Sequence, residues 1–268
     1  MTNPPLRTYG RTKARTLKPR QAALVDVLLP HLAVPAEGEI DLAALFAEPP
    51  PLGAGVGGGG VQDKALSSAD LQRELSRESA RSFAPPPYPP PKGGGGVVLE
   101  IGFGGGEHLA AQAAAHPDAC FIGVEPFLNG VASCLRHIEE GGVQNVRLHH
   151  GDARDVIARL PDASADLVYI LFPDPWPKTR HHKRRLIQPE FLGELARVLK
   201  PGAEVRFATD WANYAEWTLE QFVRDARFVW TAERAEDWRK PWPGHVTTRY
   251  EAKKLGDCAP VWLRFVKR

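Results

Sequence analysis

From residue 97 onward, short apolar runs alternate with longer segments in which apolar residues recur every three or four positions. Short apolar runs that end at glycine, proline or an acidic residue predict buried strands, and helical spacing predicts helices. The predicted strands are 97–101, 120–124, 146–149, 167–172, 204–208, 228–230 and 261–266, and the predicted helices are 108–116, 128–140, 186–199 and 214–224. This alternation predicts a doubly wound α/β fold, with helices on both faces of a mainly parallel, seven-stranded sheet.

Two tracts rich in proline and glycine set the first third of the chain apart. They span 49–60 and 85–96, and such a composition cannot pack a core. The segment between them carries leucines at loosely helical spacing, which fits either a short surface helix or a disordered chain. We therefore expect an α/β domain with an N-terminal extension. The divisions are a basic segment at 1–35, a partly disordered Pro/Gly-rich insertion or linker at 36–96, and the domain at 97–268.

A glycine-rich loop, Gly102–Gly106, follows the first predicted strand and opens the first predicted helix. Glycines gather where a backbone adopts positive φ or approaches a ligand closely, although a tight turn without a ligand is the alternative. Glu107 occupies the third glycine position of the dinucleotide pattern G-x-G-x-x-G, which disfavours a nicotinamide-dependent dehydrogenase. The acidic Glu100 before the loop suits a ligand that carries an ammonium, such as the methionine moiety of S-adenosylmethionine.

Two further acids follow the next predicted strands. Glu125 ends the second strand about twenty residues after the glycines, where doubly wound nucleotide sites hold the acid that accepts the ribose hydroxyls. Asp152 follows the third strand and is placed to accept a hydrogen bond from an adenine amino group. Because the carboxyl ends of parallel strands form one crevice, these acids together with Glu100 predict a site for S-adenosylmethionine, although each alone could be a surface charge.

The fourth predicted strand leads into the loop Phe172–Lys178, in which prolines flank Asp174. Prolines restrict the backbone, so we expect Asp174 to be presented rigidly toward the same crevice, with a turn-capping role as the alternative. Trp176 in this loop could stack on a base or pack beneath the loop.

Basic residues are clustered, although the net charge is only +2. Residues 7–20 carry six Lys or Arg side chains and no acidic one, and Arg180–Arg185 adds a second cationic run directly after the Asp174 loop. Such clusters on a nearly neutral chain indicate a polyanion contact, and the position of the second run suits phosphate groups.

These motifs together resemble the bacterial tRNA (guanine-N7-)-methyltransferase family. The resemblance rests on the runs Leu99–Gly106, Phe172–His181, Lys183–Arg185, Ala208–Trp211 and Thr248–Glu251, and it covers about 97–268. It implies transfer of a methyl group from S-adenosylmethionine to N7 of a guanine in the variable loop of tRNA. The segment 36–96 departs from the pattern, and the basic leader resembles that of some members more weakly; we expect 1–35 to contact RNA.

The resemblance also implies roles for individual residues. It assigns cofactor binding to Glu100, Gly102, Gly104, Glu125, Asp152 and Asp174, with Asp174 also the catalytic residue. It assigns substrate binding to Lys178, Arg180, His181, Lys183, Arg184, Arg185, Asp210, Thr248, Arg249, Tyr250 and Glu251.

The chemistry of guanine N7 fits this set of residues. N7 carries a free lone pair, so no base has to remove a proton before it attacks the methyl sulfonium. Catalysis can therefore rest on alignment and on carboxylates that offset the positive charge arriving on the purine. We expect Asp174 to supply this effect, by accepting hydrogen bonds from the guanine N1–H and amino group.

Three alternative functions explain part of the pattern. A methyltransferase for small molecules or proteins accounts for the glycines and Glu125 but leaves the adjoining cations unused, and Glu107 disfavours a nicotinamide oxidoreductase. A noncatalytic RNA-binding protein on the same scaffold would bind tRNA without forming a product. A DNA adenine methylase would have two adjacent prolines after its acid, where this chain has Trp176 after Pro175.

Cysteine usage and hydropathy complete the expectations. Cys120, Cys134 and Cys258 are widely spaced, which disfavours a disulfide framework and a structural zinc site. The apolar stretch after the basic leader is interrupted by charged and proline residues, and no run approaches the ~20 apolar residues that a membrane span needs. We expect a cytoplasmic monomer or homodimer without metal.

Overall fold

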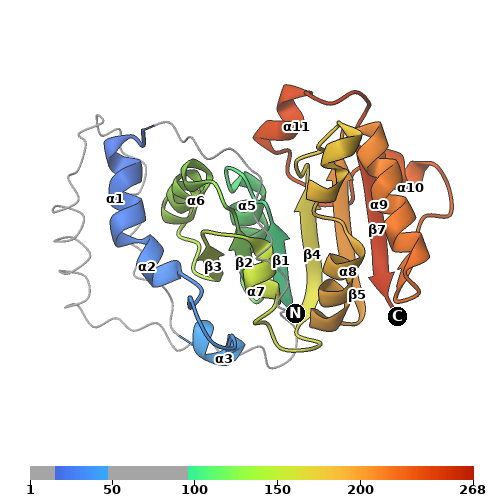
Figure 1. Ribbon diagram of the computed structural model, residues 1–268. Coiled ribbons are helices and arrows are strands. Elements are labelled where there is room, and N and C mark those ends of the chain that lie inside the picture. Colours follow the sequence, from blue (N-terminus) through green and yellow to red (C-terminus); the bar gives the residue numbers. More distant parts are fainter. Residues whose placement is uncertain (1–15, 48–95) are drawn as a thin grey trace.

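The computed structural model describes residues 16–47 and 96–268. Its described part contains one seven-stranded sheet in the order β3-β2-β1-β4-β5-β7-β6 (Figure 1). Neighbours from β3 through to β5 pair in parallel, whereas β7 is antiparallel to both β5 and β6. The strands are β1 Val97–Ile101, β2 Cys120–Val124, β3 Val146–His149, β4 Ala165–Leu171, β5 Leu199–Thr209, β6 Phe228–Trp230 and β7 Val261–Lys267. The predicted doubly wound, mainly parallel sheet is confirmed.

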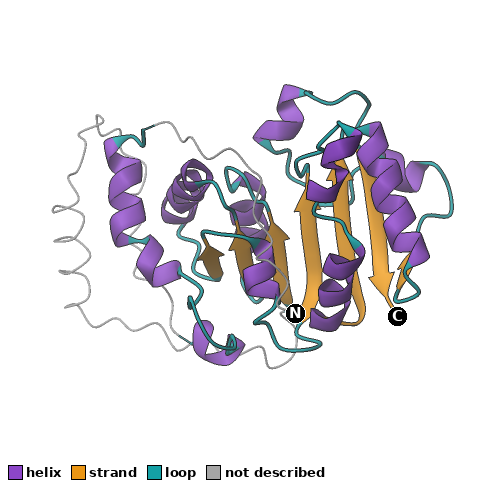
Figure 2. Cartoon of the chain, viewed as in Figure 1, coloured by secondary structure: helices purple, strands orange, loops and turns teal. Residues whose placement is uncertain are grey.

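Helices cover both faces of this sheet (Figure 2). One face carries α1 Pro19–Val27, α2 Leu29–Leu32, α5 Glu107–Ala115 and α6 Leu128–Gly141, and the other carries α3 Leu42–Leu45, α7 Ala153–Ile157, α8 Pro189–Val198 and α9 Ala212–Arg224. Three short elements, η1 Thr179–Arg184, α10 Glu236–Arg239 and α11 Arg249–Lys253, lie in connections. The predicted helix 186–199 begins only at Pro189, because proline at the first helical position loses no hydrogen bond there.

Alternation along the strands separates two apolar cores. In β1, Val97, Leu99 and Ile101 join the core under α7, α8 and α9, whereas Val98 joins the core under α5 and α6. Side chains of a strand point alternately to opposite faces. The fourth residue of β1, Glu100, therefore points toward the face that α5 covers.

The described N-terminal residues wrap around the β3 edge of the sheet. Leu24 and Leu32 are buried against the α6 side, and the Val34 N–H donates to the Leu148 carbonyl of β3 at 2.9 Å. Ile40 and Phe46 then pack into the core of the opposite face. These two residues are therefore part of the core, although they lie in the segment from 36 onward that we expected to be an insertion or linker. Residues 1–15 and 48–95 lie outside the described part of the chain. The predictions for the two Pro/Gly tracts, for the segment between them and for most of the basic leader therefore concern residues that the structure does not describe.

Buried Arg147 ties this wrapped segment to the sheet. Its Nε donates to the Leu45 carbonyl at 2.8 Å, and its guanidinium lies 4.9 Å from the centre of the Phe46 ring. Within the described ranges, no helix is both long and apolar enough to cross a membrane.

Candidate functional site

The candidate site lies where neighbouring parallel strands end. The order β3-β2-β1-β4 brings together the loops that follow these four strands, and the chain leaves β1 and β4 toward different sides of the sheet. Ligands of open α/β sheets bind at such a topological switch point, outside the carboxyl ends of the strands.

The glycine loop is bonded directly to Glu125. Gly102 and Gly104 have φ of 72° and 57°, a region that side chains disfavour. The Gly104 N–H donates to Glu125 Oε2 at 2.8 Å, and the Phe127 N–H donates to Glu125 Oε1 at 2.9 Å. Both oxygens of this carboxyl thus fix the end of β2 against the loop that follows β1.

Burial raises the pKa of Glu125 to about 7, although the N–H groups of Phe127 and Gly104 oppose the shift. The negative charge of Asp174 raises the pKa of Glu125 further. Only 8% of Glu125 is exposed. Asp174, in the loop after β4, thus acts through its charge on Glu125 at the end of β2, and the common binding site expected for these two acids stays a prediction.

Close packing of α6 holds the glycine loop from the other side. A Cβ added at Gly130 of α6 would lie 2.3 Å from the Gly104 carbonyl oxygen, so only glycine fits this position. We did not single out Gly130 from the sequence, because a glycine inside a helix gives no sign of which backbone lies against it.

Glu100 is buried beneath α5 rather than on the open rim where we expected it. It is 1% exposed, and its Oε2 lies 2.7 Å from His108 Nδ1. The His108 ring in turn lies edge-on to Tyr169 at 4.7 Å between ring centres. His108 was missed in the sequence because helical spacing alone marks it only as a residue of the buried face.

Asp152 begins α7 at the end of β3. Its Oδ1 accepts from the Arg154 N–H at 3.0 Å, and its Oδ2 pairs with Arg154 Nη1 at 2.9 Å. This capping role orients the carboxylate at the rim, because an N-cap side chain is held by the first turn of its helix.

Asp174 is exposed at the rim, in a loop whose backbone is strained. Phe172 and Trp176 have φ of 50° and 45°, which non-glycine residues rarely adopt. Such conformations persist where surrounding contacts hold them, and they are common at functional sites.

Arg185 supplies one of these contacts, which corrects its predicted role in substrate binding. It is 1% exposed, its Nε donates to the Pro175 carbonyl at 2.9 Å, and its Nη2 donates to Asn213 Oδ1 at 2.7 Å. Its guanidinium also lies over the rings of Tyr214 and Trp217. A buried guanidinium cannot reach an RNA phosphate, so Arg185 positions the Asp174 loop instead.

The other cations of the run remain at the surface. Lys178, Arg180 and Lys183 are exposed in or beside η1. Arg184 lies over the Trp176 ring at 5.0 Å, and His181 meets the same ring edge-on at 5.9 Å. Trp176 therefore packs with its own neighbours, which favours the packing alternative over base stacking.

Asp210 shapes the connection that follows β5. Its Oδ2 accepts from the Gly256 N–H at 2.8 Å, and its carbonyl accepts from the Cys258 N–H at 3.0 Å. These two bonds hold the segment before β7 beside the end of β5. Asp210 therefore organises this connection, and its expected contact with substrate stays a prediction.

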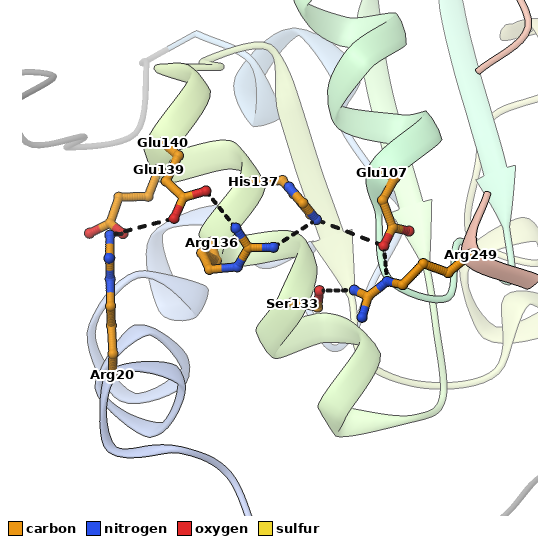
Figure 3. Close-up of polar contacts among 8 residues, drawn as sticks. All are labelled: Arg20, Glu107, Ser133, Arg136, His137, Glu139, Glu140 and Arg249. Carbon is orange, nitrogen blue, oxygen red and sulfur yellow. Dashed lines mark hydrogen bonds and ion pairs between the residues drawn. The ribbon is translucent and has the colours of Figure 1, made fainter. Parts of the chain in front are cut away.

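The motif Thr248–Glu251 starts α11, which lies at the glycine loop. Thr248 and Glu251 form a capping box, and Arg249 forms an ion pair with Glu107 while its Nη2 donates to Ser133 Oγ at 2.6 Å (Figure 3). A Cβ at Gly104 would lie 3.6 Å from the Tyr250 ring. Within the described residues, no group of three or more His, Cys, Asp or Glu side chains could hold a metal ion.

The comparisons with known proteins agree with this geometry. A family model described as "Putative methyltransferase" matches residues 95–262. A tRNA (guanine-N(7)-)-methyltransferase of Caulobacter sp. (strain K31) is 50% identical over 273 residues, which cover 100% of both chains. One from Caulobacter vibrioides (strain NA1000 / CB15N) is also 50% identical, over 98% of this chain and 96% of its own.

A third relative of the same name, from Hyphomonas neptunium (strain ATCC 15444), is 43% identical over 97% of this chain and 99% of its own. These alignments also span the first third, which we had set apart from the family pattern. The chain belongs to the tRNA (guanine-N(7)-)-methyltransferase family.

Proposed function

We propose that this enzyme transfers a methyl group from S-adenosylmethionine to N7 of a guanine in the variable loop of tRNA. One observation carries the proposal for the site: the Gly104 N–H of the glycine loop donates to Glu125 Oε2 at 2.8 Å, which joins the ends of β1 and β2. In support, the negative charge of Asp174 raises the pKa of Glu125. Asp174 follows β4, and exposed cations follow Asp174 in the chain, which supports a substrate site next to the cofactor acid Glu125.

The residues present fit the cofactor. A Cβ at Gly102 would meet nothing within 4 Å, so the loop has an open side at the rim. A carboxylate has about four acceptor sites, and the backbone N–H groups occupy two of those on Glu125, which leaves acceptors for the two ribose hydroxyls. Asp152 would accept from the adenine amino group. Glu100, which is 1% exposed and bonded to His108, would act on the ammonium through its charge rather than by direct contact.

When bound, S-adenosylmethionine supplies a methyl group on a positively charged sulfur. The chain's own part is to align the guanine, so that the N7 lone pair meets the methyl carbon opposite the sulfur, and to stabilise the positive charge that the purine gains. Asp174 does this by accepting hydrogen bonds from N1–H and the 2-amino group, within a loop that Arg185 keeps in place.

Exposed Lys178, Arg180 and Lys183 contact RNA phosphates beside the reacting base. Phosphate contacts position a nucleic acid without selecting its sequence. Guanine N7 faces the deep groove of an RNA helix, which side chains cannot read, so the base is presented from an irregular region or extruded. The enzyme acts on tRNA in the cytoplasm.

The test is the methylated nucleoside itself. Wild type and Asp174→Asn are incubated with tRNA and labelled methyl donor, the RNA is digested, and the product is identified by mass spectrometry. We expect 7-methylguanosine from wild type and a rate at least 100-fold lower from the variant, with cofactor affinity changed less. The matched control is Asp118→Asn, an exposed acid just before β2, at the end of that strand opposite to the site.

Equal rates for wild type and Asp174→Asn would remove Asp174 from the mechanism. Binding of tRNA without any product would favour a noncatalytic RNA-binding protein, and a substrate affinity that does not change with salt would favour a small-molecule or protein substrate.

A further inference from the structure

Helix α5 holds the substrate motif as well as the glycine loop. The residues concerned are 242–251, here called the motif segment, which ends in Thr248–Glu251. Glu107, His108 and Gln112 of α5 each meet this segment. Since α5 begins directly after Gly106, one short helix links the two predicted binding regions.

The inner contacts involve buried side chains of α5. Gln112 Nε2 donates to the Gly244 carbonyl at 2.6 Å, and the His108 ring lies 5.6 Å from the His245 ring between centres. The His245 side chain is 4% exposed and its Nε2 lies 2.8 Å from Glu251 Oε2. Glu251 also closes the capping box of α11. The first part of the motif segment is therefore held by α5 and by Glu251, the last residue of the same segment.

The outer contact is the ion pair between Glu107 and Arg249 (Figure 3). A Cβ at Gly105 would lie 2.6 Å from Glu107 Oε1 and 2.7 Å from Arg249 Nη2, so the pair lies directly against the glycine loop. The Arg249 side chain is 59% exposed, whereas that of Glu107 is 20% exposed. Such a partly exposed pair adds little to overall stability. Its effect is instead to determine where Arg249 points.

We propose that Glu107 is a positioning residue, which holds Arg249 against the glycine loop and thereby couples cofactor binding to tRNA binding. The inference rests on the proposed function, because Arg249 is taken to contact RNA. A ligand that orders the glycine loop also orders the residue paired with it, so less freedom remains to be lost when RNA binds the motif segment. The coupling must be reciprocal: RNA strengthens cofactor binding by the same factor.

The position of Glu107 gives the inference a specific form. Glu107 occupies the position of the third glycine in a dinucleotide-binding loop. In such a loop this glycine allows the helix to pack closely against the strand. Here α5 begins with a carboxylate that reaches a segment more than a hundred residues later in the chain. A glycine at this position could not form the ion pair with Arg249 that Glu107 forms.

The experiment measures the Kd of an unmodified tRNA transcript, with and without saturating S-adenosylhomocysteine, by filter binding. We expect the cofactor product to tighten tRNA binding by wild type about 5- to 10-fold, within the usual range of coupling between sites. Glu107→Gln should reduce this factor to less than about twofold while its Kd for S-adenosylhomocysteine without RNA stays within about twofold of wild type.

Two further variants separate positioning from a general structural effect. In an Arg249→Ala background, Glu107→Gln should have no additional effect, because residues that act through one contact are not additive. Glu140→Gln is the matched control, since it removes a carboxylate that pairs with Arg136 at 2.6 Å and does not pair with Arg249 (Figure 3). It should keep the full coupling.

Full coupling in Glu107→Gln, or none in wild type, would overturn the inference even if wild type forms 7-methylguanosine. Additive effects of Glu107→Gln and Arg249→Ala would also overturn it. Failure of wild type to methylate or to bind tRNA would instead reject the proposed function, and the inference with it.

Discussion

Replacing Glu125 by glutamine should change how the stability of this enzyme depends on pH. The folded protein raises the pKa of Glu125 from 4.5 to about 7, chiefly by burial. Because the folded state holds this proton more tightly than the unfolded state, its contribution to stability is fully present below pH 4.5. That contribution is lost as pH rises through about 7. The whole change corresponds to about 3 kcal/mol, since one pKa unit is worth about 1.4 kcal/mol.

The assay is urea unfolding of wild type and Glu125→Gln at several pH values from 5 to 8. Glutamine cannot accept from both the Gly104 and Phe127 N–H groups, so the variant carries a constant penalty of about 1–3 kcal/mol. The informative quantity is therefore the difference between the two free energies of unfolding, wild type minus variant. It should fall by about 2.5 kcal/mol between pH 5 and pH 8.

An exposed acid serves as the control for this measurement. Glu190→Gln, in the first turn of α8, removes one carboxylate away from the site and reports the effect of a changed net charge. The difference between the free energies of unfolding of wild type and Glu125→Gln could instead stay constant or grow with pH. Either result would refute the reasoning that burial is the main cause of the raised pKa of Glu125.

Three other substitutions test separate parts of the structure. Arg185→Met should lower the free energy of unfolding by about 2–3 kcal/mol, because the Pro175 carbonyl and Asn213 lose a charged donor. It should also slow methyl transfer at least 10-fold. A folded variant with wild-type activity would contradict the positioning role. Lys183→Ala should weaken tRNA binding and reduce the slope of log K against log salt by about 0.7–0.9, and an unchanged slope would exclude a phosphate contact. Phe46→Ala should cost about 3–5 kcal/mol in urea unfolding, whereas a cost below about 1 kcal/mol would mean that the wrapped segment is not part of the core.

Much of the fold could be predicted because its signals are local. Short apolar runs such as 97–101 are typical of inner strands of a parallel sheet, which are buried on both faces, and the structure confirms that strand with the predicted bounds. The helix predicted at 186–199 was less accurate, because the buried Ile187 and the partly buried Leu186 lie in the connection before Pro189 rather than in a helix. Apolar residues at helical spacing indicate burial, so a buried connection can give the same sequence pattern as the buried face of a helix.

The site could be predicted only in part for the same reason. The placement of Glu125 followed from the rule that parallel strands end at one edge, and its hydrogen bond to Gly104 agrees with that rule. Arg185 was assigned to the RNA surface with its cationic neighbours, because a run of basic residues in a sequence does not indicate which of the side chains is buried. Asn213 and Tyr214, which make its burial possible, lie on a helix that the sequence does not connect with it.

By itself, the sequence determined the alternation of strands and helices, the acids at the strand ends and the prolines around Asp174, because each depends on neighbouring residues and on backbone restrictions. Only the tertiary structure decided that Glu100 turns beneath α5, that Arg185 supports a loop and that Arg249 reaches Glu107. These outcomes depend on contacts between residues far apart in the chain, and the direction in which a side chain points follows from the packing of whole elements.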